Sequence, residues 1–349
     1  MTPHLTHEHE GATLTATGSV PHATAPAPEQ PGQGRPALAA RTRDLGVRFG
    51  MVWVLIALAI LSNILYPGFF EPGNLNNMIG EVAPVGIVAV GMTFVIIAGG
   101  FDLSVGAVFA VASVTYAGLG NHMPLALAFL CTCLLGILAG SVNGLVIARL
   151  KVNPFIATLA TASLFSGFGF LVSHSNPIIS TAGNFSQLGT GKWVGIWIST
   201  YFLIAFLAVG GFVLARTTYG RSVYAVGGNG EAARLAGMRT GWLRMSTFMI
   251  TGLSAAVAGM IVASQTGVGQ ADIGSNITLD SIAIVIVGGT ALMGGEGAMW
   301  RTIIGVLIWG TITNLFSSLA LSTSAQLLLQ GAILLVAVSL DSFARSNRR

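Results

Sequence analysis

The stretch AGGFDLSVGAVFA (Ala98–Ala110) joins two long apolar runs and carries a single charged side chain, Asp102. The runs cover about residues 79–98 and 103–120, and each approaches the roughly 20 apolar residues that a membrane-spanning helix needs. Gly99 and Gly100 allow the backbone to turn between them. An isolated charge is costly in lipid, so the stretch predicts a helix break, either a turn or a re-entrant segment.

Composition supports a membrane protein over the whole chain. Of 349 residues, 53% are hydrophobic and only 8% are charged, whereas soluble domains have about 25% charged residues. The 46 glycines suit close helix packing in lipid. The fold class is therefore predicted to be all-α, a polytopic membrane protein.

The apolar runs predict about ten transmembrane helices. The predicted spans are 50–66, 79–98, 103–120, 124–148, 154–173, 196–215, 243–265, 278–295, 302–320 and 324–341. If they alternate from a cytoplasmic N-terminus, all of the 16 Lys and Arg residues except Lys192 lie inside. This agrees with the positive-inside rule and predicts both termini in the cytoplasm, including a basic C-terminus at 343–349.

Residues 1–48 differ from the rest because they are rich in Pro, Thr, Ala and Gly. Such a segment cannot bury a core, and we expect a disordered cytoplasmic tail ahead of a transmembrane domain at 49–342. Its HLTHEHE sequence is interpreted as solvated rather than metal-binding, because no second ligand cluster completes a site. Cys131 and Cys133 lie inside an apolar run and are expected to be free thiols.

Polar residues inside the predicted spans have two interpretations. Asp102 could cap the helix that follows it, near the cytoplasmic face and helped by Ser104, or it could line a solute path. For Asn143 and Asn314, interhelical hydrogen bonds and solute contacts remain equally open, and Thr158 is assigned to the solute path or to a helix cap. The predicted spans contain no paired carboxylates, Ser/His/Asp set or metal-ligand spacing.

The polar segment 217–242 is predicted to lie in the cytoplasm. Its G-x-G-x-x-A pattern resembles a dinucleotide fingerprint, but the required βαβ unit has no room before the next span. A short helix fits better, capped by Asn229 or Gly230 and ended by Gly237. We expect it to dock on a partner protein, the alternative being an ordinary amphipathic loop helix. The predicted docking residues are Asn229, Gly230, Glu231, Ala232, Ala233, Arg234, Leu235, Ala236 and Gly237.

Three further patterns bear on function and packing. GTGKW (Gly189–Trp193) lacks the first Gly and the Ser/Thr of a P-loop, so any ATP use is assigned to another chain. Gly136, Gly140 and Gly144 are four residues apart and predict close helix packing. The sequence around Asp102 is weakly echoed around Glu296 (VIVGGTALMGGEGAM), which suggests an internal repeat.

Four stretches together resemble the permease subunits of bacterial ABC importers for simple sugars, the ribose-type permeases. They are GGFDLSVGA, VNGLVIARLKVNPFIATLAT, AVGGNGEAARLAGM and VGGTALMGGEGA, and the resemblance covers about residues 50–342. It implies a second permease copy in a homodimer or a heterodimer, a cytoplasmic ATPase with two nucleotide-binding domains that holds ATP and Mg²⁺, and an extracytoplasmic solute-binding protein. The family's coupling segment falls on Asn229–Gly237.

The resemblance implies import of a monosaccharide or polyol across the inner membrane by alternating access. It implies no enzyme activity or cofactor in this chain itself, and no nucleic-acid partner. Other small polar solutes, such as nucleosides or branched-chain amino acids, remain alternatives. An ion-coupled secondary transporter is the rival class, with Asp102 or Asp280 as the titrating group.

Overall fold

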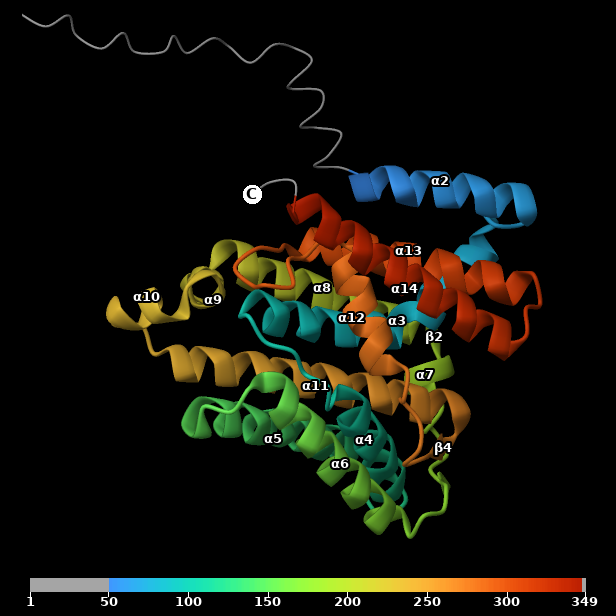
Figure 1. The fold of residues 1–349 in the computed structure, drawn as a ribbon. Coiled ribbons are helices and arrows are strands. Elements are labelled where there is room, and N and C mark those ends of the chain that lie inside the picture. Colours follow the sequence, from blue (N-terminus) through green and yellow to red (C-terminus); the bar gives the residue numbers. More distant parts are fainter. Residues whose placement is uncertain (1–49, 347–349) are drawn as a thin grey trace, which may run out of the picture. The chain divides into compact units, whose positions relative to one another are not determined.

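The computed structural model describes residues 50–346. The expected tail at 1–48 and the end of the basic C-terminus lie outside this range. One helix falls on each of the ten predicted spans (Figure 1). These helices are α2 (Gly50–Leu65), α3 (Pro72–Ile97), α4 (Val105–Gly120), α5 (Leu125–Leu150), α6 (Pro154–Ser173), α8 (Ile198–Arg216), α11 (Thr240–Thr266), α12 (Ile277–Val287), α13 (Met299–Ser318) and α14 (Thr323–Ser346).

Length and hydropathy divide nine of these helices, all except α14, into two groups. Within the described residues, six helices are long and apolar enough to cross a membrane: α3, α5, α6, α8, α11 and α13. Helices α2, α4 and α12 are apolar but shorter, at 16, 16 and 11 residues. At about 1.5 Å per residue, α12 reaches only about 17 Å, roughly half of a bilayer core. The all-helical membrane fold is confirmed, whereas ten complete crossings are not.

The predicted span 278–295 was wrong at its C-terminal end. Helix α12 stops at Val287, and residues 288–298 contain no regular helix. The chain turns at Gly289, which has a φ of +90°, a conformation that glycine adopts without strain. A hydrophobic sequence continues past this point, but the backbone does not continue as a helix.

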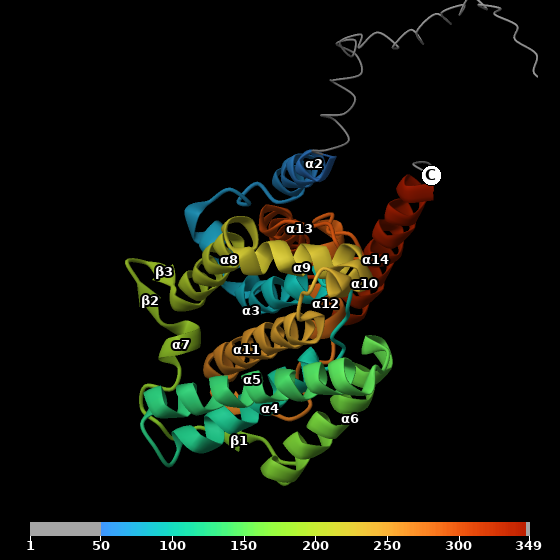
Figure 2. The ribbon, with the colours of Figure 1, turned by 90° about the vertical axis from the view of Figure 1, so that its left-hand side faces the viewer.

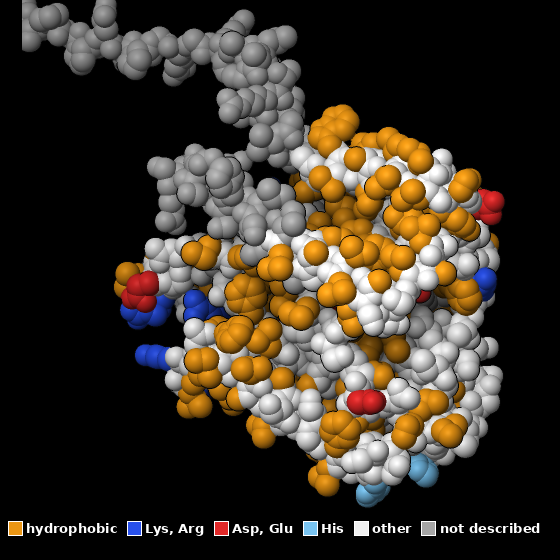
Figure 3. Space-filling view, turned by 45° about the vertical axis from the view of Figure 1, so that its right-hand side comes forward, with side chains coloured by type: hydrophobic (Ala, Val, Ile, Leu, Met, Phe, Trp, Pro, Cys, Tyr) orange, Lys and Arg blue, Asp and Glu red, His pale blue; other side chains and the backbone are white. Residues whose placement is uncertain are grey.

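Helices α3 and α11 form the interior of the described structure. In the most apolar 18-residue stretch of α3, 89% is buried inside the structure, against 22–28% of the corresponding stretches of α5, α6 and α8. These three helices expose large apolar side chains such as Leu138, Leu164 and Phe212. Figure 3 shows hydrophobic side chains over much of one face, with Lys and Arg at its margins. Exposed apolar surface of this kind suits contact with lipid.

The glycine stripe of α5 packs directly on α11, as the sequence predicts. A methyl group at Gly136 would lie 2.5 Å from Ala256 Cβ, and one at Gly144 would lie 2.5 Å from Met245 Cα. At Gly140 it would overlap the carbonyl group of Phe248. The two backbones therefore touch along the stripe, and larger side chains would force them apart.

Short elements occupy the two opposite ends of the helices (Figures 1 and 2). At one end, which we call the hairpin end, strands β1 (Ile178–Ile179) and β4 (Val268–Gly269) pair antiparallel, as do β2 (Lys192–Trp193) and β3 (Ile196–Trp197). Helix α7 (Gln187–Thr190) lies beside them. At the other end, the docking end, lie α9 (Thr218–Gly228) and α10 (Gly230–Leu235).

Helices α4 and α12 begin beside each other in the interior. The backbone N–H of Gly106, in the first turn of α4, donates a hydrogen bond of 3.1 Å to Thr278 Oγ1, in the first turn of α12. Gly106 also packs against the backbone of Gly274, just before α12. Two short helices from distant parts of the chain therefore start beside each other inside the protein.

Candidate functional site

The predicted docking helix is present as α10, and its ends follow the expected capping chemistry. The Asn229 side chain accepts a hydrogen bond of 2.9 Å from the N–H of Ala232, so Asn229 is the N-cap. Gly237 has a φ of +83° and ends the helix through a 3.0 Å bond from its N–H to the Arg234 carbonyl. Both ends of this short helix are therefore held by local hydrogen bonds.

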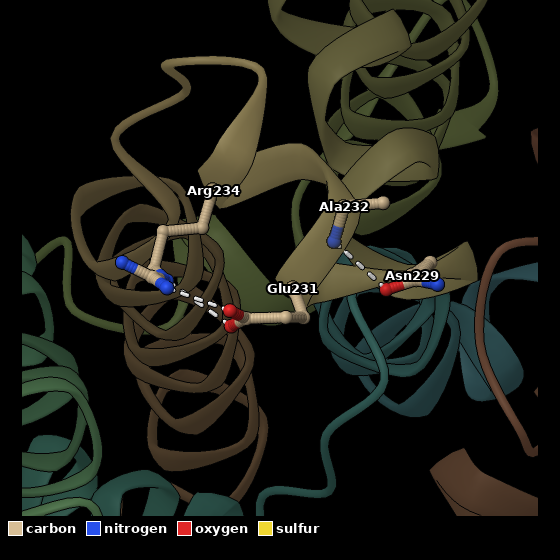
Figure 4. Close-up of polar contacts among 4 residues, drawn as sticks. All are labelled: Asn229, Glu231, Ala232 and Arg234. Atoms are coloured by element: carbon tan, nitrogen blue, oxygen red, sulfur yellow. Dashed lines mark hydrogen bonds and ion pairs between the residues drawn. The ribbon is translucent and has the colours of Figure 1, made fainter. Parts of the chain in front are cut away.

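The charged side chains of α10 pair with each other (Figure 4). Arg234 Nη2 and Nε donate to the two Glu231 oxygens at 2.6 Å and 3.0 Å. This pairing holds the pKa of Glu231 below its usual value. The two side chains are 65% and 61% exposed, and Leu235 is 74% exposed, whereas Ala233 is buried. Helix α10 thus presents an ion pair and a leucine outward while Ala233 faces the protein.

Helix α9 leads directly into α10 and was missed in the sequence. Its N-cap is Thr217, whose side chain accepts from the Gly220 N–H at 3.1 Å. Its side chains bind two other segments: Tyr219 and Ser246 on α11 share a 2.7 Å hydrogen bond, and Tyr224 donates to the Gly297 carbonyl at 2.8 Å. The Thr-Thr pair at 217–218 is an N-cap signal that was available in the sequence.

Asp102 lies in a buried polar cluster with three of the predicted polar residues nearby. One carboxylate oxygen accepts from the N–H and the hydroxyl of Ser104, at 2.9 Å and 2.7 Å. Asn143 on α5 donates to Ser104 Oγ at 2.7 Å and, more weakly, to Asp102 at 3.4 Å. Thr158 on α6 accepts from the Leu103 N–H at 3.1 Å. All four side chains are buried, and hydrogen bonds hold this segment to α5 and α6.

Thr161 completes the network and was not predicted. Its hydroxyl donates to Asn143 Oδ1 at 2.5 Å, and the side chain is buried. Thr158 and Thr161 are three residues apart on α6, so they share one helix face. The spacing of Thr158 and Thr161 is visible in the sequence.

The geometry at Asp102 differs from the expected helix cap. The carboxylate binds Ser104, which precedes α4, whereas the first-turn N–H of Gly106 is taken by Thr278 of α12. Asp102 therefore orients the chain as it leads into α4. Its partner Asn143 lies seven residues before Leu150, the last residue of α5, which corresponds to about 10 Å along the helix. The residue that Asp102 contacts on α5 is therefore inside that helix and not at its end.

Asn314 lies apart from this network. It is on α13 and exchanges hydrogen bonds of 3.0 Å and 3.1 Å with Asn74 on α3. This reciprocal amide pair joins two helices, so Asn314 makes the interhelical hydrogen bond that is one of the two roles predicted for it. Cys131 and Cys133 lie in α5 as free thiols. Over residues 50–346, no group of three or more His, Cys, Asp or Glu side chains is placed to hold a metal ion.

The fold and these sites define a class: an all-helical, multi-pass membrane protein with several short apolar helices and a capped, exposed helix at one end. The sequence comparison identifies the family. Residues 74–338 match the model of the family described as branched-chain amino acid transport system / permease component. The chain belongs to this family.

Several curated relatives align over most of their length. The chain is 39% identical over 290 residues to the ribose import permease protein of Bacillus subtilis (strain 168). This alignment covers 82% of this chain and 90% of the relative. It is 36% identical over 326 residues to the L-arabinose transport system permease protein of Escherichia coli (strain K12), covering 91% and 97%. The ribose import permease protein of Haemophilus influenzae is 36% identical, over 84% and 93%. No solved structure was found to match the chain.

Proposed function

We propose that this chain is the membrane permease subunit of a bacterial ATP-binding-cassette importer for a monosaccharide. The observation that carries the proposal is the alignment with ribose and L-arabinose permeases over 82% and 91% of this chain. Pentoses of this kind define the expected solute class. The family description names branched-chain amino acids, but the relatives with the high identities are named for sugars, so the sugar is favoured.

Helix α10 is proposed as the docking site for the partner ATPase. Helix α10 has only six residues, and isolated helices of this length are unstable in water. Its caps hold these residues in the helical conformation. Its exposed face offers Leu235 for apolar contact and a charge pair for polar contact. A short rigid helix of this type suits a groove on a soluble partner better than it suits lipid.

The remaining assignments follow from that placement. The docking end would face the cytoplasm, together with both termini, and the hairpin end would face the extracytoplasmic solute-binding protein. ATP and Mg²⁺ would bind to the partner ATPase. Two permease copies would enclose the solute path, and ATP-driven motion of α10 would open it to one side at a time. The rival ion-coupled carrier is not favoured by the relatives.

The experiment is affinity purification of the full chain from its native membrane, with mass spectrometry of bound proteins. We expect a stoichiometric ATPase. The double variant Glu231→Ala/Arg234→Ala removes both members of the ion pair at once and leaves no unpaired charge, so it is expected to lose the ATPase and sugar uptake while remaining in the membrane. The control is Lys192→Ala at the hairpin end. Recovery of the chain alone, with uptake in liposomes that needs no ATP, would overturn the proposal.

The solute is tested separately by uptake of labelled ribose, L-arabinose, a nucleoside and leucine into cells expressing the complete system. We expect ATP-dependent uptake of one of the pentoses. Uptake of leucine or a nucleoside instead would keep the importer class and replace the sugar assignment.

A further inference from the structure

The last turn of α9 contacts both of the places where the membrane helices break. The first break follows α3 (residues 98–104) and the second follows α12 (residues 288–298). The N–H of Gly295, in the second break, donates a 2.9 Å hydrogen bond to the carbonyl of Ile97, the last residue of α3 before the first break. The two breaks, almost 200 residues apart in sequence, are therefore joined directly through their backbones.

Gly227 of α9 lies against this hydrogen bond. A methyl group at Gly227 would overlap the Ile97 carbonyl oxygen and lie 2.6 Å from the Gly295 nitrogen. Gly294 is equally confined, because a methyl group there would lie 2.8 Å from Gly99 Cα and 3.0 Å from the Gly227 oxygen. Three backbones thus meet with no side chain between them. We call this contact of Gly99, Gly227, Gly294 and Gly295 the glycine junction.

The two breaks also share one local geometry. After α3, the N–H groups of residues 98, 99 and 100 bond back to the carbonyls of residues 94, 96 and 95, and after α12 those of residues 288, 289 and 290 bond to the carbonyls of residues 284, 286 and 285. Gly99 and Gly289 both have positive φ, at +79° and +90°. The first break leads into α4 and the second into α13. The junction contacts the first break at its turn, Gly99, and the second break beyond its turn at Gly289, at Gly294 and Gly295.

Helix α9 is firmly held on the docking side of the junction. Asn229 alone separates it from α10, and the Tyr224 hydroxyl donates to the Gly297 carbonyl, within the second break, at 2.8 Å. Backbones in van der Waals contact transmit displacement without the slack that side-chain rotamers allow. Helix α9 thus connects α10 to the junction with only Asn229 between the two helices.

We propose that the glycine junction is the positioning element that transmits the movement of α10 to both helix breaks at once, with Gly227 and Tyr224 as its contact residues on α9. The inference rests on the proposed docking of an ATPase on α10. It adds that the force reaches α4 and α13 through backbone contact at Gly227, rather than through the long helix α11 that follows α10.

The test compares two alanine variants one residue apart in the full transporter complex. Gly227→Ala places a methyl group on the Ile97 carbonyl, whereas at Gly228 the nearest atom to such a methyl group, Gly295 Cα, is 4.0 Å away. We expect Gly227→Ala to bind the ATPase and hydrolyse ATP but to lose uptake by about tenfold or more, which is a typical size for a coupling effect. Gly228→Ala should keep uptake within about twofold of the wild type.

A second variant keeps the inference testable if Gly227→Ala does not fold. Tyr224→Phe removes only the hydroxyl bond to Gly297, and we expect ATPase binding to be unchanged, with several-fold fewer solute molecules moved per ATP hydrolysed. Wild-type coupling in Gly227→Ala, or in Tyr224→Phe where the first variant does not fold, would overturn the junction. Absence of the ATPase from the wild-type complex would instead overturn the proposed function, so the two failures can be told apart.

Discussion

Replacement of Asp102 separates a structural carboxylate from one that binds a transported ion. In Asp102→Ala, the N–H and the hydroxyl of Ser104 lose their acceptor, while Asn143 keeps its 2.7 Å bond to Ser104 Oγ. Each buried donor left without a partner costs about 1–3 kcal/mol. Two such donors predict a loss of about 2–6 kcal/mol in the free energy of unfolding.

Asp102→Asn is the matched milder change, because it keeps an oxygen in the same position. Hydrogen bonds to a neutral acceptor are roughly half as strong as those to a carboxylate, so we expect a loss of about 1–2 kcal/mol. The assay is the midpoint of thermal unfolding of the purified protein in detergent, together with sugar uptake at several pH values and Na⁺ concentrations. The expected order of stability is wild type, then Asp102→Asn, then Asp102→Ala.

Two results would refute this reasoning. If Asp102→Ala unfolds at the wild-type temperature, the network around Ser104 does not stabilise the fold. If Asp102→Asn is stable but loses a dependence of uptake on H⁺ or Na⁺ that the wild type has, Asp102 takes part in ion coupling and the rival carrier gains support.

Three further predictions follow from other contacts. Gly140→Leu is expected to prevent folding into the membrane, since a side chain there meets the Phe248 carbonyl; recovery of the protein in the membrane fraction measures this. Asn314→Leu leaves the amide of Asn74 without one of its partners and should lower the free energy of unfolding by about 1–3 kcal/mol, measured by thermal unfolding. The pKa of Glu231 is lowered by Arg234 on α10. The stabilisation that Glu231 contributes is therefore present above its unfolded pKa of about 4.3 and is lost only as the pH falls through the lower folded pKa. ATPase co-purification that already weakened between about pH 8 and pH 6 would contradict this.

Local chemistry explains which parts of the structure could be predicted. Hydrophobic runs marked one helix at each of the ten positions, because burial in lipid depends on composition over about 20 residues. The two ends of α10, marked by Asn229 and Gly237, could be predicted because capping involves residues only three or four positions apart. The α5 stripe at Gly136, Gly140 and Gly144 was likewise visible as a spacing on one helix face.

Tertiary structure decided what depends on distant segments. The end of α12 at Val287 was missed, because a hydrophobic sequence continues beyond the backbone turn. The one distant partner of Asp102, Asn143, comes from α5. The α4 first-turn N–H of Gly106 is taken by Thr278, 172 residues away, so no local pattern could show that Asp102 leaves this group to another helix. The glycine junction joins Gly99, Gly227 and Gly294. A sequence shows that glycines are present, but only the packed backbones show that they touch.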